Sequence, residues 1–179
     1  IEVDDLLIDL SASIAEVMDS KAQFIQEDAV RPQILKESDV IISDLPVGFY
    51  PSDEIAKRYK VASSDEHTYA HHLLMEQSLK YLKKDGIAVF LAPVSLLTSK
   101  QSDLLKAWLK DYADVIAVIT LPESIFGNAA NAKSIFVLKK QAEHTPETFV
   151  YPLADLQSRE ALTDFIEKFK KWNVENMIF

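Results

Sequence analysis

The uninterrupted apolar run at residues 87–92 places the strongest constraint on the fold of this chain. A strand that lacks polar alternation fits a parallel sheet that helices cover on both faces. Apolar residues at helical spacing precede and follow this run, from about residue 66 to 84 and from about residue 100 to 112. The first of these helices is expected to end at Asp85-Gly86, where glycine suits a left-handed cap. Because short strands alternate with helical segments, the sequence predicts an α/β fold.

Further elements continue this order along the chain. Residues 4–18 carry apolar side chains on one helical face, and a similar stripe from Leu162 to Trp172 predicts the last helix. The strands at 115–121 and 134–139 have no helix between them, which predicts an antiparallel pair because such a pair needs no long crossover. Other strands are expected at residues 1–3, 22–26, 40–43 and, after a proline-containing linker and at a sheet edge, 149–151.

The composition limits the kinds of protein that this chain can be. Its length suits one domain with its own core, so residues 1–179 are expected to form a single domain. Without cysteine, disulfides and thiolate-bound metals are excluded, and a reducing cytoplasm is favoured. Because no leader or bilayer-length apolar segment is recognisable, we expect a cytoplasmic protein without membrane contact. The net charge of −9 argues against unaided nucleic-acid binding, since phosphate contacts dominate that affinity.

A carboxylate stands where a predicted buried strand leaves the sheet. Asp44 opens a turn that continues through Leu45 and Pro46, and the aromatic residues Phe49 and Tyr50 follow closely. In open α/β sheets, ligands bind at the carboxyl ends of the strands. A carboxylate and an aromatic ring on such a turn can present polar atoms and a flat surface to a planar substrate. The alternative is a turn that only ends a core strand.

Two other acidic residues follow predicted strands. Glu2 ends the first strand, at the point where an acid in nucleotide-binding α/β domains accepts hydrogen bonds from ribose hydroxyls. Asp28, followed by Ala29, comes after the second strand and could accept a hydrogen bond from the amino group of an adenine ring. The alternative for Asp28 is a turn, whereas Asp4 and Asp5 are explained as helix caps.

Three histidines, His67, His71 and His72, cluster at the start of a predicted helix. Only His67 and His71 share a face, and no Glu-x-x-His pattern assists them, so helix histidines without a metal are favoured. The chain also lacks the Gly-x-Ser-x-Gly elbow that would support a serine nucleophile. Its glycines are far apart, which excludes a P-loop or a dinucleotide fingerprint within this chain.

Taken together, these motifs and the order of the elements resemble the catalytic domain of S-adenosylmethionine-dependent DNA adenine-N6 methyltransferases, in particular the modification subunit of type I restriction systems. The resemblance covers residues 1–140 and leaves 141–179 as a C-terminal edge strand and helix. Its motifs are Glu2, Asp28-Ala29, Asp44-Leu45-Pro46-Val47, and the segments 121–126 and 132–140. It implies a class I methyltransferase-like fold, a three-layer, doubly wound and mostly parallel sheet with an antiparallel closing strand.

The resemblance also implies roles for residues of these motifs. Glu2 and the neighbouring Val3 would hold the ribose of S-adenosyl-L-methionine. Asp28, with the amide of Ala29, would hold the adenine of the cofactor. Asp44 would belong to both the catalytic and the cofactor-binding residues. No metal is implied.

Asp44 would occupy the first position of the family's catalytic Asp/Asn-Pro-Pro-Tyr/Phe tetrapeptide, followed by Leu45 and Pro46. The Asp44 side chain and the Leu45 carbonyl would accept hydrogen bonds from the target amino group, whose lone pair is otherwise delocalised into the adenine ring. This would aim the lone pair at the sulfonium methyl group, so that transfer depends on positioning and electrostatics.

The sequence departs from the family pattern in two places. Leu45 replaces the first proline and Val47 the stacking aromatic, so Phe49 or Tyr50 would supply the ring that holds the extruded base. The family's glycine-rich loop, and the strand before it, would have to precede Ile1. Because that strand lies beside the catalytic strand, its absence would expose apolar side chains and backbone along a central sheet edge.

We therefore expect this chain alone to bind S-adenosylmethionine weakly or not at all, and either to be inactive by itself or to compensate by pairing with a second copy. DNA would be contacted by regions or subunits outside this chain, such as the specificity subunit of a restriction-modification system. Two alternatives remain open. The acceptor could be RNA, a protein or a small molecule, or the chain could be a catalytically inactive interaction module.

Overall fold

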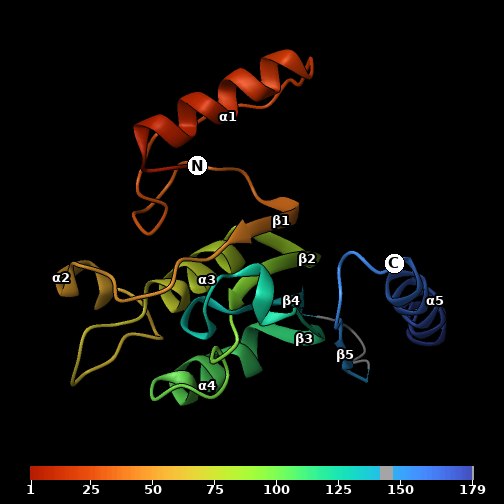
Figure 1. Cartoon of the computed structure of the whole chain (residues 1–179). Coiled ribbons are helices and arrows are strands. Elements are labelled where there is room, and N and C mark those ends of the chain that lie inside the picture. Colours follow the sequence, from red (N-terminus) through yellow and green to blue (C-terminus); the bar gives the residue numbers. More distant parts are fainter. Residues whose placement is uncertain (142–146, 179) are drawn as a thin grey trace. The chain divides into compact units, whose positions relative to one another are not determined.

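Five strands form one sheet in the computed structural model, which describes residues 1–141 and 147–178 (Figure 1). The strands are β1 (Ser38–Asp44), β2 (Leu82–Pro93), β3 (Ala113–Thr120), β4 (Lys133–Lys140) and β5 (Phe149–Pro152). Their order across the sheet is β1-β2-β4-β3-β5. Strand β4 runs antiparallel to both of its neighbours, whereas the β1–β2 and β3–β5 pairs are parallel. The mostly parallel sheet with one antiparallel strand, expected from the sequence, is therefore confirmed.

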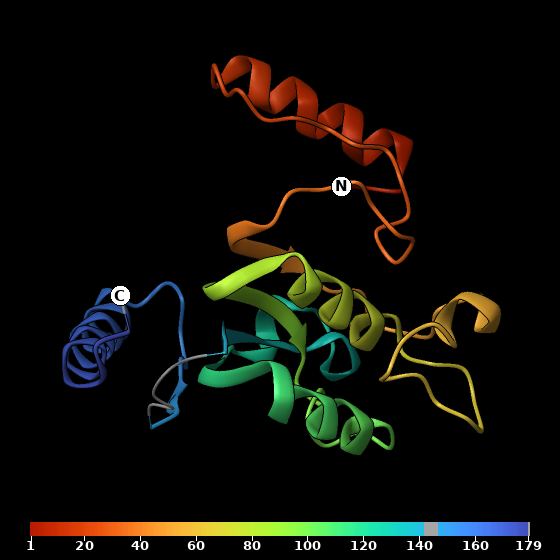
Figure 2. The ribbon, with the colours of Figure 1, turned by 180° about the vertical axis from the view of Figure 1, so that it is seen from behind.

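Helices cover both faces of this sheet. They are α3 (Ala70–Lys80), α4 (Ser102–Tyr112) and α5 (Arg159–Asn176), whereas the short α2 (Asp53–Ala56) and the 3-10 turns at Glu123–Ile125 and Ala129–Asn131 lie in connecting segments. Helix α3 packs on β2 and α4 on β3 (Figure 2), while α5 contributes Trp172 to a buried cluster that includes Ile87 of β2. The intervening β2 residues, such as Ala88 and Phe90, point to the opposite face and are fully buried. A strand that is apolar on both sides thus produces a three-layer arrangement.

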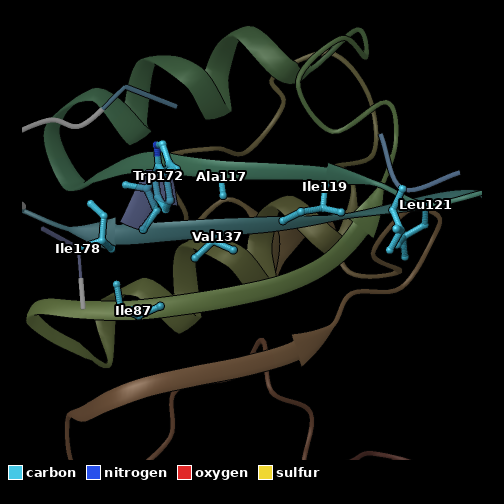
Figure 3. Packing of buried hydrophobic residues seen from close by; sticks show 9 residues of the cluster. Ile87, Ala117, Ile119, Leu121, Val137, Trp172 and Ile178 are labelled. Carbon is cyan, nitrogen blue, oxygen red and sulfur yellow. The ribbon is translucent and has the colours of Figure 1, made fainter. Parts of the chain in front are cut away.

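Trp172 anchors α5 on the sheet. It belongs to the buried cluster that also contains Val137 of β4 (Figure 3). Its indole Nε1 donates a hydrogen bond to the carbonyl oxygen of Glu147 at 2.7 Å. The ring of Phe149 packs against Phe169 and Trp172, with centroid separations of 5.4 and 5.5 Å. This aromatic packing explains why the edge strand β5 and the last helix, both expected from the sequence, stay with the sheet.

Residues 1–35 form a unit of their own. Its helix, α1 (Asp5–Val17), begins where the sequence predicts, because the Asp4 side chain caps it by accepting a hydrogen bond from the Leu7 amide at 2.9 Å. The residues from 36 onward form the second unit. The assignment of residues 1–179 to a single methyltransferase domain therefore stays a proposal, and most of the linker expected before β5, residues 142–146, lies outside the described residues.

The strands expected at residues 1–3 and 22–26 are wrong. Pairing between these segments is limited to one parallel bridge between Glu2 and Gln26. Because Phe24 is 41% exposed, the segment has no buried apolar face that would stabilise a longer ladder. None of the helices within the described ranges combines the length and the apolar character needed to span a lipid bilayer.

Strand β1 lies at one edge of the sheet, with β2 as its neighbour among the described residues. Val40 and Ile42 are 55% and 77% exposed, although their register partner Ile87 belongs to the cluster that contains Trp172 and their register partner Val89 packs against it. The resemblance implied an open apolar edge of this kind beside the catalytic strand.

Helix α3 ends earlier than the sequence predicts. It ends at Lys80 and strand β2 begins at Leu82, so the expected cap at Asp85-Gly86 is wrong. The left-handed residue is Asp85, with φ of 61°, whereas Gly86 lies inside β2. A Cβ on Gly86 would lie 2.8 Å from Leu82 Cγ and from the carbonyl oxygen of Lys83. Glycine is therefore required by the close approach of the chain to itself and not by a positive φ.

Two neighbouring substitutions should change the free energy of unfolding in opposite directions. Gly86→Ala should destabilise the chain by about 1–3 kcal/mol, because the added methyl group collides with the Lys83 carbonyl. Asp85→Gly should stabilise it by up to about 1 kcal/mol, because glycine relieves the left-handed backbone. Urea denaturation of both variants and the parent measures these changes. A destabilising Asp85→Gly together with a neutral Gly86→Ala would contradict the left-handed backbone at Asp85 and the close contact at Gly86.

Candidate active site at the end of β1

Backbone pairing fixes the start of the turn at the carboxyl end of β1. The Leu45 amide donates to the Leu91 carbonyl at 2.8 Å, which extends the pairing with β2 by one residue. Leu45 is fully buried, so the preceding Asp44 points the other way, and its side chain is 67% exposed. Proline, which the family pattern has after the catalytic acid, has no amide hydrogen. Leu45 therefore makes a ladder bond that proline could not make, which explains this departure structurally.

The residues before α3 hold the rest of the turn. Gly48 has φ of 123°, in the region that favours glycine, and its carbonyl accepts a hydrogen bond from the Ala70 amide at 3.0 Å. The Tyr50 amide donates to the Thr68 carbonyl at 2.8 Å. Because these residues are paired with the turn, α3 begins at Ala70, later than the sequence predicts.

Phe49 and Tyr50 lie in different surroundings. The ring of Phe49, which is 52% exposed, stacks on Tyr69 with centroids 4.7 Å apart and planes 10° apart. Tyr69 in turn stacks on His71 at 5.0 Å. Tyr50 is 7% exposed and lies in the interior. Of the two rings considered from the sequence, Phe49 is the one that the turn leaves open, beside the exposed Val47.

His71 connects α3 to the turn. Its Nδ1 lies 3.2 Å from the Pro46 carbonyl oxygen, and since a carbonyl can only accept, Nδ1 carries the proton. Burial lowers the pKa of His71 to about 4, opposed by the Pro46 bond and aided by the charge of Lys133. Burial and the charge of His71 lower the pKa of His72 to about 3. Both imidazoles are therefore neutral at pH 7.

His71 and His72 are buried residues of α3, and their rings contact each other with centroids 4.8 Å apart. His67 is separate from the other two, because it is exposed and its Nδ1 lies 2.8 Å from Asp53 Oδ1. Within residues 1–141 and 147–178, no group of three His, Cys, Asp or Glu side chains is placed to hold a metal ion.

Asp44 is paired with a cation that the sequence interpretation missed. Lys133, the first residue of β4, donates to Asp44 Oδ1. The Lys133 side chain is 14% exposed and that of Asp44 is 67% exposed, so a nearly buried ammonium group meets an open carboxylate. The sequence placed Lys133 only in the closing strand. The two residues are 89 positions apart, and no local motif encodes the strand order that joins them.

A polar cleft of about 330 Å³ lies in the loop that follows the turn. It is lined by residues 53, 56, 57 and 63–68. The ring of His67, on this lining, has its centroid 6.4 Å from that of Phe49. The fully buried Glu76 of α3 fixes this loop, because its Oε2 accepts a hydrogen bond from the Val61 amide at 3.0 Å. Its Oε1 forms an ion pair with Lys80 at 2.7 Å. A structured, polar surface thus adjoins the open ring.

Glu2 and Asp28, the carboxylates expected to bind a cofactor, lie in the first unit. Glu2 Oε1 accepts hydrogen bonds from the amides of Val3 and Asp4 at 2.7 and 2.9 Å. The bridge between Glu2 and Gln26 joins this segment to the one that leads into Asp28. The two acids therefore belong to neighbouring backbone segments.

Asp28 takes part in a local turn. Its Oδ1 accepts a hydrogen bond from the Val30 amide at 2.9 Å, and its Oδ2 lies 3.7 Å from Arg31 Nε. The turn that was the alternative interpretation of Asp28 is thus present, with Ala29 half-buried beside it. Cofactor binding by Glu2 and by Asp28 stays a prediction.

Comparison with known proteins identifies the family of this chain. The family model described as N-6 DNA Methylase matches residues 8–178, a range that takes in β5 and α5 as well as the site. The chain belongs to the N-6 DNA methylase family. The resemblance drawn from the sequence is thereby confirmed.

Two relatives share substantial sequence identity with this chain. The uncharacterized protein YtxK of Bacillus subtilis (strain 168) is 38% identical over 175 residues, which cover 96% of this chain and 53% of YtxK. A crystal structure from Listeria monocytogenes, assigned as a class I S-adenosylmethionine-dependent methyltransferase, is 31% identical, with a TM-score of 0.86 over 95% of this chain and 53% of its own. The chain spans about half the length of these relatives.

More distant structures share the fold. A protein of Vibrio vulnificus YJ016, assigned as the modification subunit of a type I restriction enzyme, has a TM-score of 0.77 over 95% of this chain and 40% of its own. The type I restriction-modification system methyltransferase subunit from Streptococcus thermophilus has a TM-score of 0.72 over 96% and 41%. Both are 14% identical to this chain. They support the class I methyltransferase-like fold expected from the sequence.

Protonation of the buried histidines should make stability depend on pH. The folded-state pKa values of about 4 for His71 and about 3 for His72 lie below the unfolded value of 6.5. As the pH falls below 6.5 the unfolded chain takes up protons first, so stability is complete above that pH and is lost toward pH 4. His71→Asn should reduce this loss between pH 7 and 5 by up to about 1.4 kcal/mol per pH unit.

Urea denaturation at pH 7 and pH 5 measures this difference between the parent and His71→Asn. His67→Asn removes an exposed imidazole and serves as the control for losing a histidine. Equal declines in the parent and in His71→Asn would contradict a buried, neutral His71.

Proposed function

We propose that the protein containing this chain transfers the methyl group of S-adenosyl-L-methionine to the N6 amino group of adenine in DNA. The observation that carries this proposal is the turn after β1, on which both the Asp44 carboxylate and the Phe49 side chain are exposed. Membership of the N-6 DNA methylase family and the likeness to the Listeria methyltransferase support the reaction class.

The first unit carries acceptors that suit the polar groups of the cofactor. Glu2 uses Oε1 for two backbone amides, and since a carboxylate offers about four acceptor sites, it can also bind ribose hydroxyls. Asp28 would accept a hydrogen bond from the adenine amino group, and the Ala29 amide would donate to the ring. When bound, S-adenosyl-L-methionine supplies an electrophilic sulfonium methyl group.

The turn would orient the acceptor nitrogen. A carboxylate oxygen of Asp44 would accept one amino hydrogen, which draws the nitrogen lone pair out of conjugation with the ring. The carbonyl oxygen of Leu45 would accept the other hydrogen once substrate binding exposes it, because Leu45 is fully buried in the structure. Phe49 would hold the extruded base by stacking on it. The ring of Phe49 is itself stacked on Tyr69, which fixes its orientation. These groups act by positioning and by fixed electrostatics, without a covalent intermediate on the protein.

DNA would be held largely by other regions or subunits. The chain carries a net charge of −9, which opposes contact with phosphates over most of its surface. The Streptococcus thermophilus neighbour is a subunit of a type I restriction-modification system, which supports a partner such as a specificity subunit for this protein too. The open β1 edge supports pairing with another strand or a second copy.

Asp44→Ala in the full-length protein should lower kcat for methyl transfer to DNA about 100- to 1,000-fold, because the acceptor for the amino hydrogens is lost. Asp44→Asn should retain much more activity, since an amide oxygen also accepts. Transfer of tritium from labelled S-adenosylmethionine to adenine measures both. Asp39→Ala, an exposed residue at the other end of β1 paired with Lys83, is the matched control and should leave the rate unchanged.

Wild-type rates in Asp44→Ala would contradict the catalytic role and favour an inactive interaction module. Tritium found in RNA, protein or a small molecule, with none in DNA, would keep the reaction and replace the acceptor. Product analysis by mass spectrometry separates these outcomes.

Phe49→Ala should raise the KM for DNA about tenfold to a hundredfold, because stacking of one base on an aromatic ring contributes about 1–3 kcal/mol. Phe49→Trp should keep the KM near that of the parent, since it preserves a ring at the same place. Steady-state methylation assays at varied DNA concentration measure both. An unchanged KM in Phe49→Ala would show that another group holds the base.

A further inference from the structure

Lys133 and Asp44 meet across strand β2. In the sheet register Lys133 lies opposite Pro93 and Asp44 lies opposite Leu91, so the two residues flank β2 near its carboxyl end. The lysine stem has to pass the intervening strand before the ammonium group donates to Asp44 Oδ1, and the side chain is only 14% exposed. Such a lysine is confined by its surroundings, unlike the two mobile partners of an ordinary surface ion pair.

The backbone on each side of this pair is fixed. The Leu45 amide, directly after Asp44, is bonded to the Leu91 carbonyl at 2.8 Å. The Ala132 carbonyl, directly before Lys133, accepts a hydrogen bond from the Val94 amide at 3.1 Å. Because the backbone is fixed beside both Asp44 and Lys133, their ion pair favours one orientation of the Asp44 carboxylate. Lys133 occupies Oδ1, and in the described part of the chain Oδ2 has no hydrogen-bond partner.

We propose that Lys133 is a positioning residue for methyl transfer, which holds Oδ1 of Asp44 so that Oδ2 receives the amino group of the acceptor. This role rests on the proposed function. Lys133 also compensates the charge of the carboxylate, so Asp44 offers an acceptor oxygen much as a neutral asparagine would. The family pattern has aspartate or asparagine at this position. In this chain the residue is an aspartate, and Lys133 of β4 is its counter-ion.

A double-mutant cycle in the full-length protein tests this coupling. Lys133→Met removes the ammonium group and keeps an unbranched stem. With Asp44 present, kcat should fall about tenfold to a hundredfold with little change in the KM for S-adenosylmethionine, because the acceptor is bound but misaligned. In the Asp44→Asn background the same change should alter kcat by less than about twofold, because an amide needs no counter-ion.

Lys133→Arg should restore most of the rate lost in Lys133→Met, since it returns a cation. Lys139→Met removes another lysine of β4, which donates to the Ile178 carbonyl at 3.3 Å, and should leave kcat unchanged. If Lys133→Met lowers kcat equally in the parent and in the Asp44→Asn background, the proposal is overturned, because Lys133 would then act independently of the carboxylate.

The orientation of Asp44 can also be measured without turnover. In ¹³C-labelled protein, Lys133→Met should shift the Asp44 Cγ resonance and average the scalar couplings that report its χ1 angle. An unchanged resonance and unchanged couplings would overturn the positioning role while leaving methyl transfer in place. If the parent protein transfers no methyl group to any acceptor, the proposed function fails and this role fails with it.

Discussion

The bond from the Leu45 amide to the Leu91 carbonyl sets the register on which the candidate site depends. Because side chains alternate along a strand, Leu45 enters the core and Asp44 opens to the surface. A slip of one residue would exchange them, burying a charge and exposing a leucine. Residues of β2 such as Phe90, fully buried on the face under the helices, oppose such a slip. The packing that stabilises the sheet therefore also presents the carboxylate.

The sequence predicts those parts of the fold whose cause is local or strongly periodic. The apolar run in β2, the β3–β4 pair and the amphipathic helices follow from the spacing of apolar residues. The position of the left-handed residue before this run does not follow from the spacing. Glycine is the residue that favours a left-handed backbone, yet Asp85 is the one that adopts it. Gly86 is needed for contact with Lys83, a requirement that only the folded backbone reveals. The bridge at Glu2 escapes prediction because strand propensity does not show whether a face is buried.

The residues of the candidate site also include some that the sequence predicts and one that it misses. Asp44 and its turn are predicted because the signal is contiguous in the sequence, at the end of an apolar strand. Phe49 and Tyr50 stay equal candidates until the structure shows which ring stacks on Tyr69 and which enters the core. Lys133 is missed because β4 inserts between β2 and β3, and only this order brings it to a carboxylate 89 positions away.

The distribution of charge around the turn favours an uncharged acceptor nitrogen. The Asp44 carboxylate is compensated by Lys133, and burial, which lowers the pKa of His71 to about 4 and that of His72 to about 3, keeps both imidazoles neutral at pH 7. A cationic lysine side chain of a protein substrate would gain little from the compensated carboxylate and would be repelled by the ammonium group beside it. The exocyclic amino group of a nucleobase is neutral, and it requires acceptor oxygens and a stacking surface. Asp44 and Phe49 would offer both on one turn, which fits the nucleobase acceptor proposed above.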